Sequence, residues 1–319
     1  MKRNQMIDIL KLIFAVSIIG IHCQIFLNTN TTLRALIPQG LFRIGVPFFF
    51  VTAGYYYYRK VQDDLHNKEY IKRLLKIFII FEAIEFLLYT PFSLWRFQGF
   101  GIIAYFWNMF ATGLGGAYWY LTSTILSLLI LTPLWKKKKI KPLLFVGLIL
   151  YLIVATNDSY SAVFTGTFIQ KIAQIHTYVW IWPQAGLCSS LLWLSMGAYL
   201  YEHQGKIKNN NIVLALSTIA LLVEAYFLQT NGASDANCYL SLIVCVPALF
   251  LYCLENPIYT KYQYIGKMSL YVYMVHPIVL QILRFIVPIF NSQYELLFIA
   301  GSIVTLGVSY LLSKKVKSL

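Results

Sequence analysis

The sequence is 319 residues long, and 59% of these residues are hydrophobic whereas only 12% are charged. An ordinary soluble domain has roughly 45–50% apolar and about 25% charged residues, so the composition excludes a water-soluble globular fold. The formal net charge is +14, but the basic residues stand in short clusters between apolar stretches, which argues against nucleic acid as a partner.

Ten apolar stretches follow one another along the chain. A bilayer core of about 30 Å needs roughly 20 apolar residues in a helix, because the backbone must satisfy its own hydrogen bonds there. The stretches predict membrane helices near residues 7–27, 41–58, 74–92, 115–135, 142–157, 186–201, 211–229, 238–254, 268–288 and 295–312. The apolar segment Gly101–Ala111 is too short to cross and predicts an interfacial or re-entrant helix. We therefore expect one all-α, polytopic transmembrane domain over residues 1–319, with about ten transmembrane helices.

The basic residues predict the orientation of these helices. If the N-terminus is inside, most of the 26 Lys and Arg residues fall in inner connections, including the run Lys136–Lys139, as short cytoplasmic loops require. Both termini should then be cytoplasmic, in a multi-pass protein of a bacterial-type cell membrane. The longest outer connection runs from about Asp158 to Gln184. The run Tyr55–Tyr58 is typical of an inner aromatic belt, and an outer belt is predicted at Trp95, Trp107, Trp180 and Trp182.

The cysteines predict neither disulfides nor a metal site. All five lie in or at the edges of apolar stretches, with no CxxC pair and no His at ligand spacing; they are Cys23, Cys188, Cys238, Cys245 and Cys253. Small apolar packing residues are the simplest interpretation.

The first span contains two ionisable residues, Lys11 and His22. Such residues are costly within a bilayer and are functional candidates by default. Their spacing of eleven residues places them within about 20° of one helix face, separated by roughly 16 Å along the axis. They therefore either mark two points on a path through the membrane, or Lys11 snorkels inward while His22 hydrogen-bonds a neighbouring helix.

Five segments, in order, carry motifs that occur together in one family. They are Asp8–Lys11 with His22 after ten further residues, Arg43–Gly54, Lys72–Lys76, Tyr118–Leu121 and Gly266–His276. This ordered set resembles the acyltransferase 3 family of integral membrane acyltransferases. Two positions depart from the family pattern: Lys11 stands where Arg is usual, and Ala53 stands where Ser is common. The segment Arg43–Gly54 also resembles the membrane half of vancomycin-resistance serine/alanine racemases.

The resemblance implies an O-acyltransferase that moves an acyl group, most simply acetyl, from cytoplasmic acyl-CoA to a hydroxyl of an extracytoplasmic glycan or glycolipid. Acyl-CoA would be a donor substrate, and no cofactor would be bound permanently. Acyl transfer to an alcohol needs a group that accepts the hydroxyl proton, and a neutral imidazole has a suitable pKa, so His22 is the predicted general base. Transient acylation of His22 is left open.

The remaining candidate residues fall into three groups. The basic cluster Lys72, Arg73 and Lys76 would meet the donor phosphates at the cytoplasmic face, or would reflect membrane topology alone. Glu82 and Glu85 would pair with Arg43 within the membrane. We expect His276 either to line the substrate cavity or to cap a helix end kinked at Pro277. The residues expected to contact the substrates are Lys11, Arg43, Trp119, Tyr273 and His276.

A second class of function stays open. The likeness to the membrane half of the racemases allows a transport or substrate-binding module for a small solute such as an amino acid. Membrane lipid is the expected surrounding in either case, and the sequence does not decide whether the chain forms a homo-oligomer.

Overall fold

The computed structural model describes residues 4–63, 67–93, 101–208, 210–233, 235–259, 262 and 264–315, and within these ranges every regular element is helical. The predicted all-α class is therefore confirmed for the described residues. The basic residues Lys2, Arg3, Lys261 and Lys317 and the predicted belt residue Trp95 lie outside these ranges.

The chain forms two compact units. The first, which we call the terminal unit, combines the two ends of the chain, residues 1–49 and 205–318. The second, the central unit, comprises residues 50–204. The boundary between Phe49 and Phe50 falls inside one helix, α3 (Gly45–Gln62).

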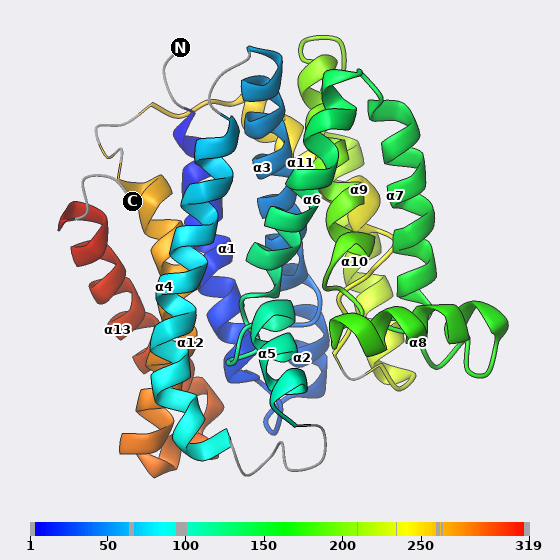
Figure 1. The fold of residues 1–319 in the computed structure, drawn as a ribbon. Helices are drawn as coiled ribbons and strands as arrows, with labels where there is room; N and C mark the ends of the chain where they lie inside the picture. The colour runs from blue at the N-terminus through cyan, green and yellow to red at the C-terminus, as the bar shows by residue number, and fades with distance from the viewer. Residues whose placement is uncertain are drawn as a thin grey trace. The chain divides into compact units, whose positions relative to one another are not determined.

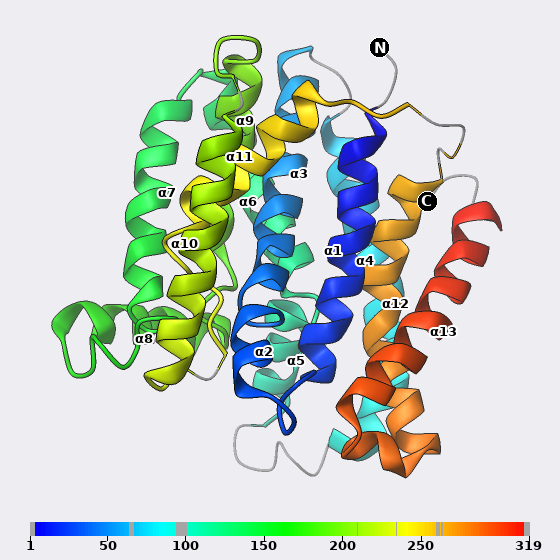
Figure 2. The ribbon, with the colours of Figure 1, turned by 180° about the vertical axis from the view of Figure 1, so that it is seen from behind.

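The terminal unit is built around the first and the last two long helices. Its other elements are α2 (Thr31–Leu36), η1 (Leu41–Ile44), the first turn of α3, α10 (Asn211–Thr230), α11 (Leu242–Glu255) and η3 (Pro288–Asn291). Helix α1 (Gln5–Cys23) packs against α12 (Ile265–Ile286) and α13 (Tyr294–Lys315), and both ribbon views show the three side by side (Figures 1 and 2). Residues from opposite ends of the sequence therefore share one helical layer.

The ends of α1 are fixed by local hydrogen bonds. The side chain of Asn4 caps the first turn by accepting the Met6 amide at 3.0 Å. At the other end Gln24 has left-handed backbone angles, and its amide donates to the carbonyls of Gly20 and Ile21. This end matters for function because His22 lies in the last turn.

Glu224, to which the sequence assigns no role, caps the start of α11. The amides of Leu240 and Ser241 donate to its two carboxylate oxygens at 2.7 and 2.9 Å. A helix N-terminus has unpaired amides and a partial positive charge, so a carboxylate there is stabilising. Glu224 thus stabilises the start of α11.

The central unit contains the rest of α3 together with α4 (Asn67–Ser93), α5 (Gly101–Thr112), α6 (Trp119–Lys136), α7 (Ile140–Ala155), α8 (Phe168–Trp180) and α9 (Leu187–Glu202). Helix α9 packs against α6 and α7. Helix α8, in contrast, runs crosswise to α7 (Figure 1).

Helices α3 and α9 approach each other through two glycines. A Cβ atom added to Gly54 would overlap the backbone carbonyl of Leu194, and one added to Gly197 would overlap the carbonyl of Val51. Small residues allow membrane helices to pack with their backbones in contact. Glycine loses more backbone entropy than other residues when it folds into a helix, and the close helix contact offsets this loss of stability.

The tyrosines after Gly54 also join α3 to its neighbours. The hydroxyls of Tyr55, Tyr57 and Tyr58 bond to Gln204 (3.0 Å), Thr132 (3.0 Å) and Glu202 (2.6 Å), respectively, and these three side chains are buried. The predicted inner aromatic belt is therefore wrong for these three residues. The three rings pack inside the unit, and their hydroxyls bond to polar side chains there. The sequence around these tyrosines does not indicate these partners, which lie on other helices or just beyond them.

Each of the ten predicted apolar stretches overlaps a helix, although some predicted bounds extend several residues beyond it. By length and composition, five segments of the described chain could cross a membrane, namely Gln5–Cys23, Thr31–Gln62, Asn211–Thr230, Ile265–Ile286 and Tyr294–Lys315. Helices α7 and α11 are apolar but shorter. Ten crossings and the cytoplasmic placement of both termini stay predictions.

Candidate functional site

Two histidines from distant parts of the sequence meet in the terminal unit. The ring centroids of His22, in the last turn of α1, and His276, in α12, are 5.0 Å apart with the ring planes inclined by 45°. The side chain of His276 is fully buried, whereas that of His22 is half-buried. The two imidazoles, one from each of two helices, are thus in ring contact.

The orientation of His276 is set by the proline that follows it. Pro277 has no amide hydrogen, so it cannot donate to the Tyr273 carbonyl four residues earlier. The Nδ1 atom of His276 lies 2.7 Å from that carbonyl and 3.3 Å from the carbonyl of Val272. Because a carbonyl only accepts, Nδ1 carries the proton, and the neutral ring has its lone pair on Nε2.

The Nε2 atom of His276 is buried and has no hydrogen-bond partner among the described residues. An unpaired acceptor in such a position is costly unless a ligand or water completes it. His276 therefore satisfies the carbonyl that Pro277 releases, but it does so within α12 and not at a helix end, because the helix continues to Ile286. A place for His276 in the lining of a substrate cavity stays a prediction. The Tyr273 ring, also buried, lies 5.9 Å from the ring of His276.

Arg284 fixes the end of α1 from the other side. Its Nη2 atom donates to the main-chain carbonyl of His22 at 3.0 Å. Carbonyls in the last turn of a helix have no partner within the helix, and a cation near them complements the helix dipole. Nothing in the sequence pattern singles out this contact, which joins residues 262 positions apart.

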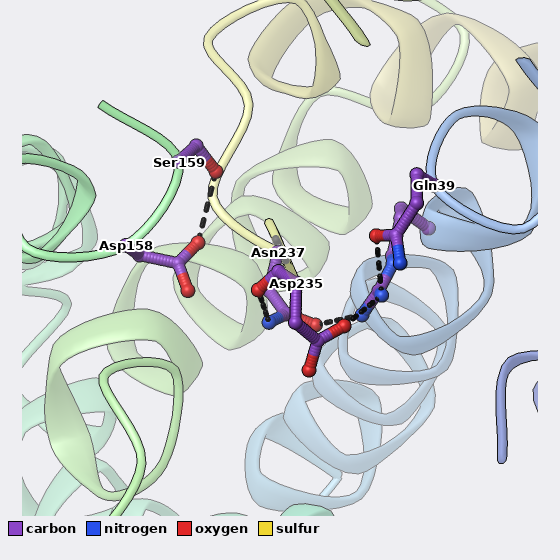
Figure 3. Close-up of polar contacts among 6 residues, drawn as sticks. Gln39, Asp158, Ser159, Asp235 and Asn237 are labelled. Atoms are coloured by element: carbon purple, nitrogen blue, oxygen red, sulfur yellow. Dashed lines mark hydrogen bonds and ion pairs between the residues drawn. The ribbon is translucent and has the colours of Figure 1, made fainter. Parts of the chain in front are cut away.

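Arg43 lies in a polar cluster of the terminal unit. The residue is 7% exposed, and its guanidinium donates to Gln39 Oε1 at 2.6 Å and contacts the carboxylate of Asp235 and the amide oxygen of Asn237. Figure 3 shows Gln39, Asp235 and Asn237 converging on this point. The Nε atom of Arg43 is buried without a hydrogen-bond partner within the described part of the chain.

The sequence predicts that Arg43 pairs with Glu82 and Glu85, and the structure gives it another carboxylate within its own unit. The carboxylate comes instead from Asp235, in the connection between α10 and α11, 192 residues from Arg43 in sequence. Asp235 was not predicted, because only carboxylates within apolar spans were considered, whereas Asp235 lies in a polar loop. The positive charge of Arg43 lowers the pKa of Asp235 below its usual value.

Three charged groups act electrostatically on the His22 ring, namely Asp235, Arg43 and Arg284. The ring of His276 adds a neutral dipole. His22 therefore stands in an environment of mixed charge that is built from three other segments of the chain, namely η1, the connection between α10 and α11, and α12.

The ion pair predicts a dependence of stability on pH. Because the folded-state pKa of Asp235 is depressed, its contribution is fully present above the unfolded value, about 3.9, and is lost as the pH falls through the lower folded-state value. The Asp235 side chain is 58% exposed, so we expect less than about 1 kcal/mol. Asp235→Asn should lower the thermal midpoint in detergent at pH 7 and flatten its decline below about pH 4. Equal acid sensitivity in the wild type and the variant would contradict this.

In the central unit, Glu82 and Glu85 of α4 hold the turn between α5 and α6. Both side chains are fully buried, and they accept the amides of Leu114 and Gly115 at 2.9 and 2.7 Å. Gly113, with φ +76°, reverses the chain at this turn. A structural role for the two carboxylates is therefore supported, although their partners are backbone amides.

The remaining predicted site residues are described by their helix and their exposure, each within its own unit. Lys72, Arg73 and Lys76 are exposed near the start of α4, in the central unit. Trp119 is half-buried at the start of α6, with its ring centroid 6.3 Å from that of Phe50. Lys11 is half-buried on α1, and the unbroken helix through His22 keeps the two residues near one face. Over the described ranges, no group of three or more His, Cys, Asp and Glu residues could hold a metal ion.

The chain is similar to curated proteins named as racemases. It is 26% identical over 308 residues to an amino-acid racemase of Enterococcus faecalis, covering 90% of this chain and 43% of the relative. It is 25% identical over 294 residues to a serine/alanine racemase of Enterococcus gallinarum, covering 86% and 40%, respectively. The chain thus spans about two fifths of the length of these relatives. No solved structure is a significant match.

A family model described as an acyltransferase domain matches residues 4–314, which include every candidate residue discussed above. Five helical segments apolar and long enough to cross a bilayer accompany this match, and the protein is a membrane protein. The resemblance inferred from five short motifs is confirmed by a match over nearly the whole sequence, and the chain belongs to the acyltransferase 3 family.

Proposed function

We propose that this protein is a membrane O-acyltransferase of a bacterial-type cell membrane. It transfers an acyl group, most simply acetyl, from cytoplasmic acyl-CoA to a hydroxyl of an extracytoplasmic glycan or glycolipid. His22 is the general base. Family membership supports acyl transfer, and the site around His22 supports the role of the base.

The observation that carries the proposal is the imidazole pair. A base for acyl transfer must be neutral before reaction, within hydrogen-bond reach of the hydroxyl, and held in one orientation. His22 is half-buried on the end of a helix whose carbonyl Arg284 holds in place. His276, with its proton fixed on Nδ1, offers Nε2 as a further acceptor next to that base.

The proton transfer can be written from these groups. As the acceptor oxygen attacks the thioester carbonyl, its proton moves to His22, and collapse of the tetrahedral intermediate releases the coenzyme A thiolate. His22 then returns the proton to the thiolate. The ring is neutral again once this proton has left it.

Arg73 provides a test of the donor side. If the exposed cluster on α4 binds the phosphates of coenzyme A, Arg73→Ala should weaken coenzyme A binding severalfold at low ionic strength, because a guanidinium binds phosphate in a bidentate manner. Binding by the variant should also depend less on salt. Isothermal titration in detergent at two salt concentrations measures both effects.

Lys68→Ala is the matched control, since Lys68 is an exposed cation on the same helix one turn earlier. If both variants bind coenzyme A as the wild type does, the cluster serves membrane topology and not the donor.

The names of the relatives favour a second candidate. Proteins named as amino-acid and serine/alanine racemases contain a region similar to this chain, so a module that transports or binds a small solute such as an amino acid is the alternative. The polar cluster of Arg43, Asp235 and Asn237 offers charges that such a solute could use.

One experiment with purified protein in proteoliposomes separates the two functions. Release of free coenzyme A from acetyl-CoA, with radiolabel passing to an added envelope lipid or glycan extract, supports the transferase. Uptake of labelled serine or alanine that does not change when acetyl-CoA is added, with no release of coenzyme A, supports the solute module and rejects the transferase.

A further inference from the structure

Helix α8 of the central unit is amphipathic, and its apolar side faces outward. The residues on its inner side are polar or small: Gln170 and Ala173 are buried, and Thr177 is half-buried. The outer side is apolar, with Phe168 76% and Ile175 65% exposed. The other exposed apolar residues of the helix are Ile169, Ile172, Tyr178 and Val179. This arrangement is opposite to that of a helix on the surface of a soluble protein.

Hydrogen bonds hold the polar side of α8 inward. Gln170 donates to the carbonyl of Ser161 at 3.0 Å and accepts the amide of Gly166 at 2.9 Å. The side chain of Asn157 donates to the hydroxyl of Thr177 at 2.9 Å. The helix therefore cannot rotate to bury its apolar side without breaking three hydrogen bonds, and the outward apolar face is a built feature.

The position of α8 identifies what covers this face. The helix runs crosswise to α7 (Figure 1) and packs against it. Helix α7 exposes apolar side chains of its own, with Phe145 64% and Val146 45% exposed, as a lipid-facing helix of a membrane protein does. Helices α7 and α8, which pack together, thus both expose apolar side chains, and lipid is the occupant that suits both.

Two tryptophans mark the C-terminal end of α8. The indole of Trp107, on α5, donates to the carbonyl of Val179 and lies 5.9 Å from the ring of Trp180. Tryptophan is enriched at the level of the lipid headgroups, where its ring is both apolar and hydrogen-bonding. The helix also has no acidic residue, and Lys171 is its single charge, which suits an anionic headgroup region.

We propose that α8 lies in the plane of the membrane interface, with its apolar face inserted between the lipid headgroups and the acyl chains. An interfacial helix of this kind buries its apolar side about 5–10 Å into the boundary. The connection between α7 and α9 is then anchored in the bilayer. This inference rests on α8 and its neighbours and is independent of the chemistry at His22.

Site-specific photocrosslinking tests the proposal on the full chain. A benzophenone amino acid is placed at position 175 in one variant and at position 174 in another, in vesicles of three parts phosphatidylcholine to one part phosphatidylglycerol. Ile175 and Gln174 are both exposed neighbours, but only the first lies on the apolar face. Position 145 on α7 serves as the lipid-facing reference, and monodisperse elution of each variant shows that it is folded.

We expect lipid adducts at position 175 to match those at position 145 and to exceed those at position 174 severalfold, as measured by mass spectrometry of the tryptic peptides. Adducts at position 175 as rare as at position 174 would mean that the face meets water. Adducts between position 175 and a second protein chain would mean that protein covers it. Either of these two results overturns the proposal.

Discussion

Replacing His22 by glutamine should reduce the rate of acyl transfer by about 10²–10⁴-fold, the usual contribution of a general base. Glutamine keeps a polar side chain of similar reach but cannot accept a proton at neutral pH. The hydrogen bond from Arg284 goes to the main-chain carbonyl of residue 22 and is unaffected by the change, so the helix end should stay intact. Release of coenzyme A thiol, followed under single-turnover conditions, measures the chemical step.

His203→Gln is the control for this change. His203 follows the last turn of α9 in the central unit, where its Nδ1 atom lies 2.9 Å from the carbonyl of Tyr199 and its ring stacks on the Tyr199 ring. It has the same chemistry as His22 but no place in the proposed site, so this variant should transfer acyl groups at the wild-type rate. A folded His22→Gln protein with wild-type activity would remove His22 from the mechanism.

The sequence predicts the helices well because their signal is local. Each apolar stretch is long, and a helix is the simplest structure that satisfies its backbone in lipid, so each of the ten predicted stretches overlaps a helix. The spacing of Lys11 and His22 on one helix is likewise a property of a single segment. Ten crossings cannot be read from length alone, because α7 and α11 are shorter than a bilayer requires.

The surroundings of His22 could be predicted only in part. The match of Gly266–His276 to a family motif indicated His276, but the contact between the two rings depends on how α1 packs against α12. The contact of Asp235 with Arg43 and the contact of Arg284 with the His22 carbonyl were not predicted. They join residues 192 and 262 positions apart, and a contact between such distant residues produces no periodic pattern in the sequence. Polar residues in connections near a buried arginine were the signal that could have suggested Asp235.

Substituting alanine for Gly197 should be among the most damaging single changes in the central unit. The added Cβ would overlap the carbonyl of Val51 and lie 2.6 Å from the amide nitrogen of Tyr55, both of them backbone atoms of α3 that no side-chain rotation can move. Overpacking of this kind costs about 1–3 kcal/mol, and rigid backbone neighbours place this site at the upper end. A loss of that size lowers the thermal midpoint of a chain of this length by about 5 °C, which a thermal-shift assay in detergent can measure.

Gly307→Ala is the matched control, because Gly307 lies within helix α13 and a Cβ there would meet no atom within 4 Å. Alanine in an open helical position stabilises by up to about 1 kcal/mol relative to glycine, so this variant should melt at or slightly above the wild-type temperature. Gly54→Ala should behave like Gly197→Ala, since its Cβ would overlap the Leu194 carbonyl from the opposite helix. If Gly197→Ala instead has the same thermal midpoint as Gly307→Ala, the backbones of α3 and α9 are not in contact. The presence of Gly54 in the Arg43–Gly54 motif then needs another explanation.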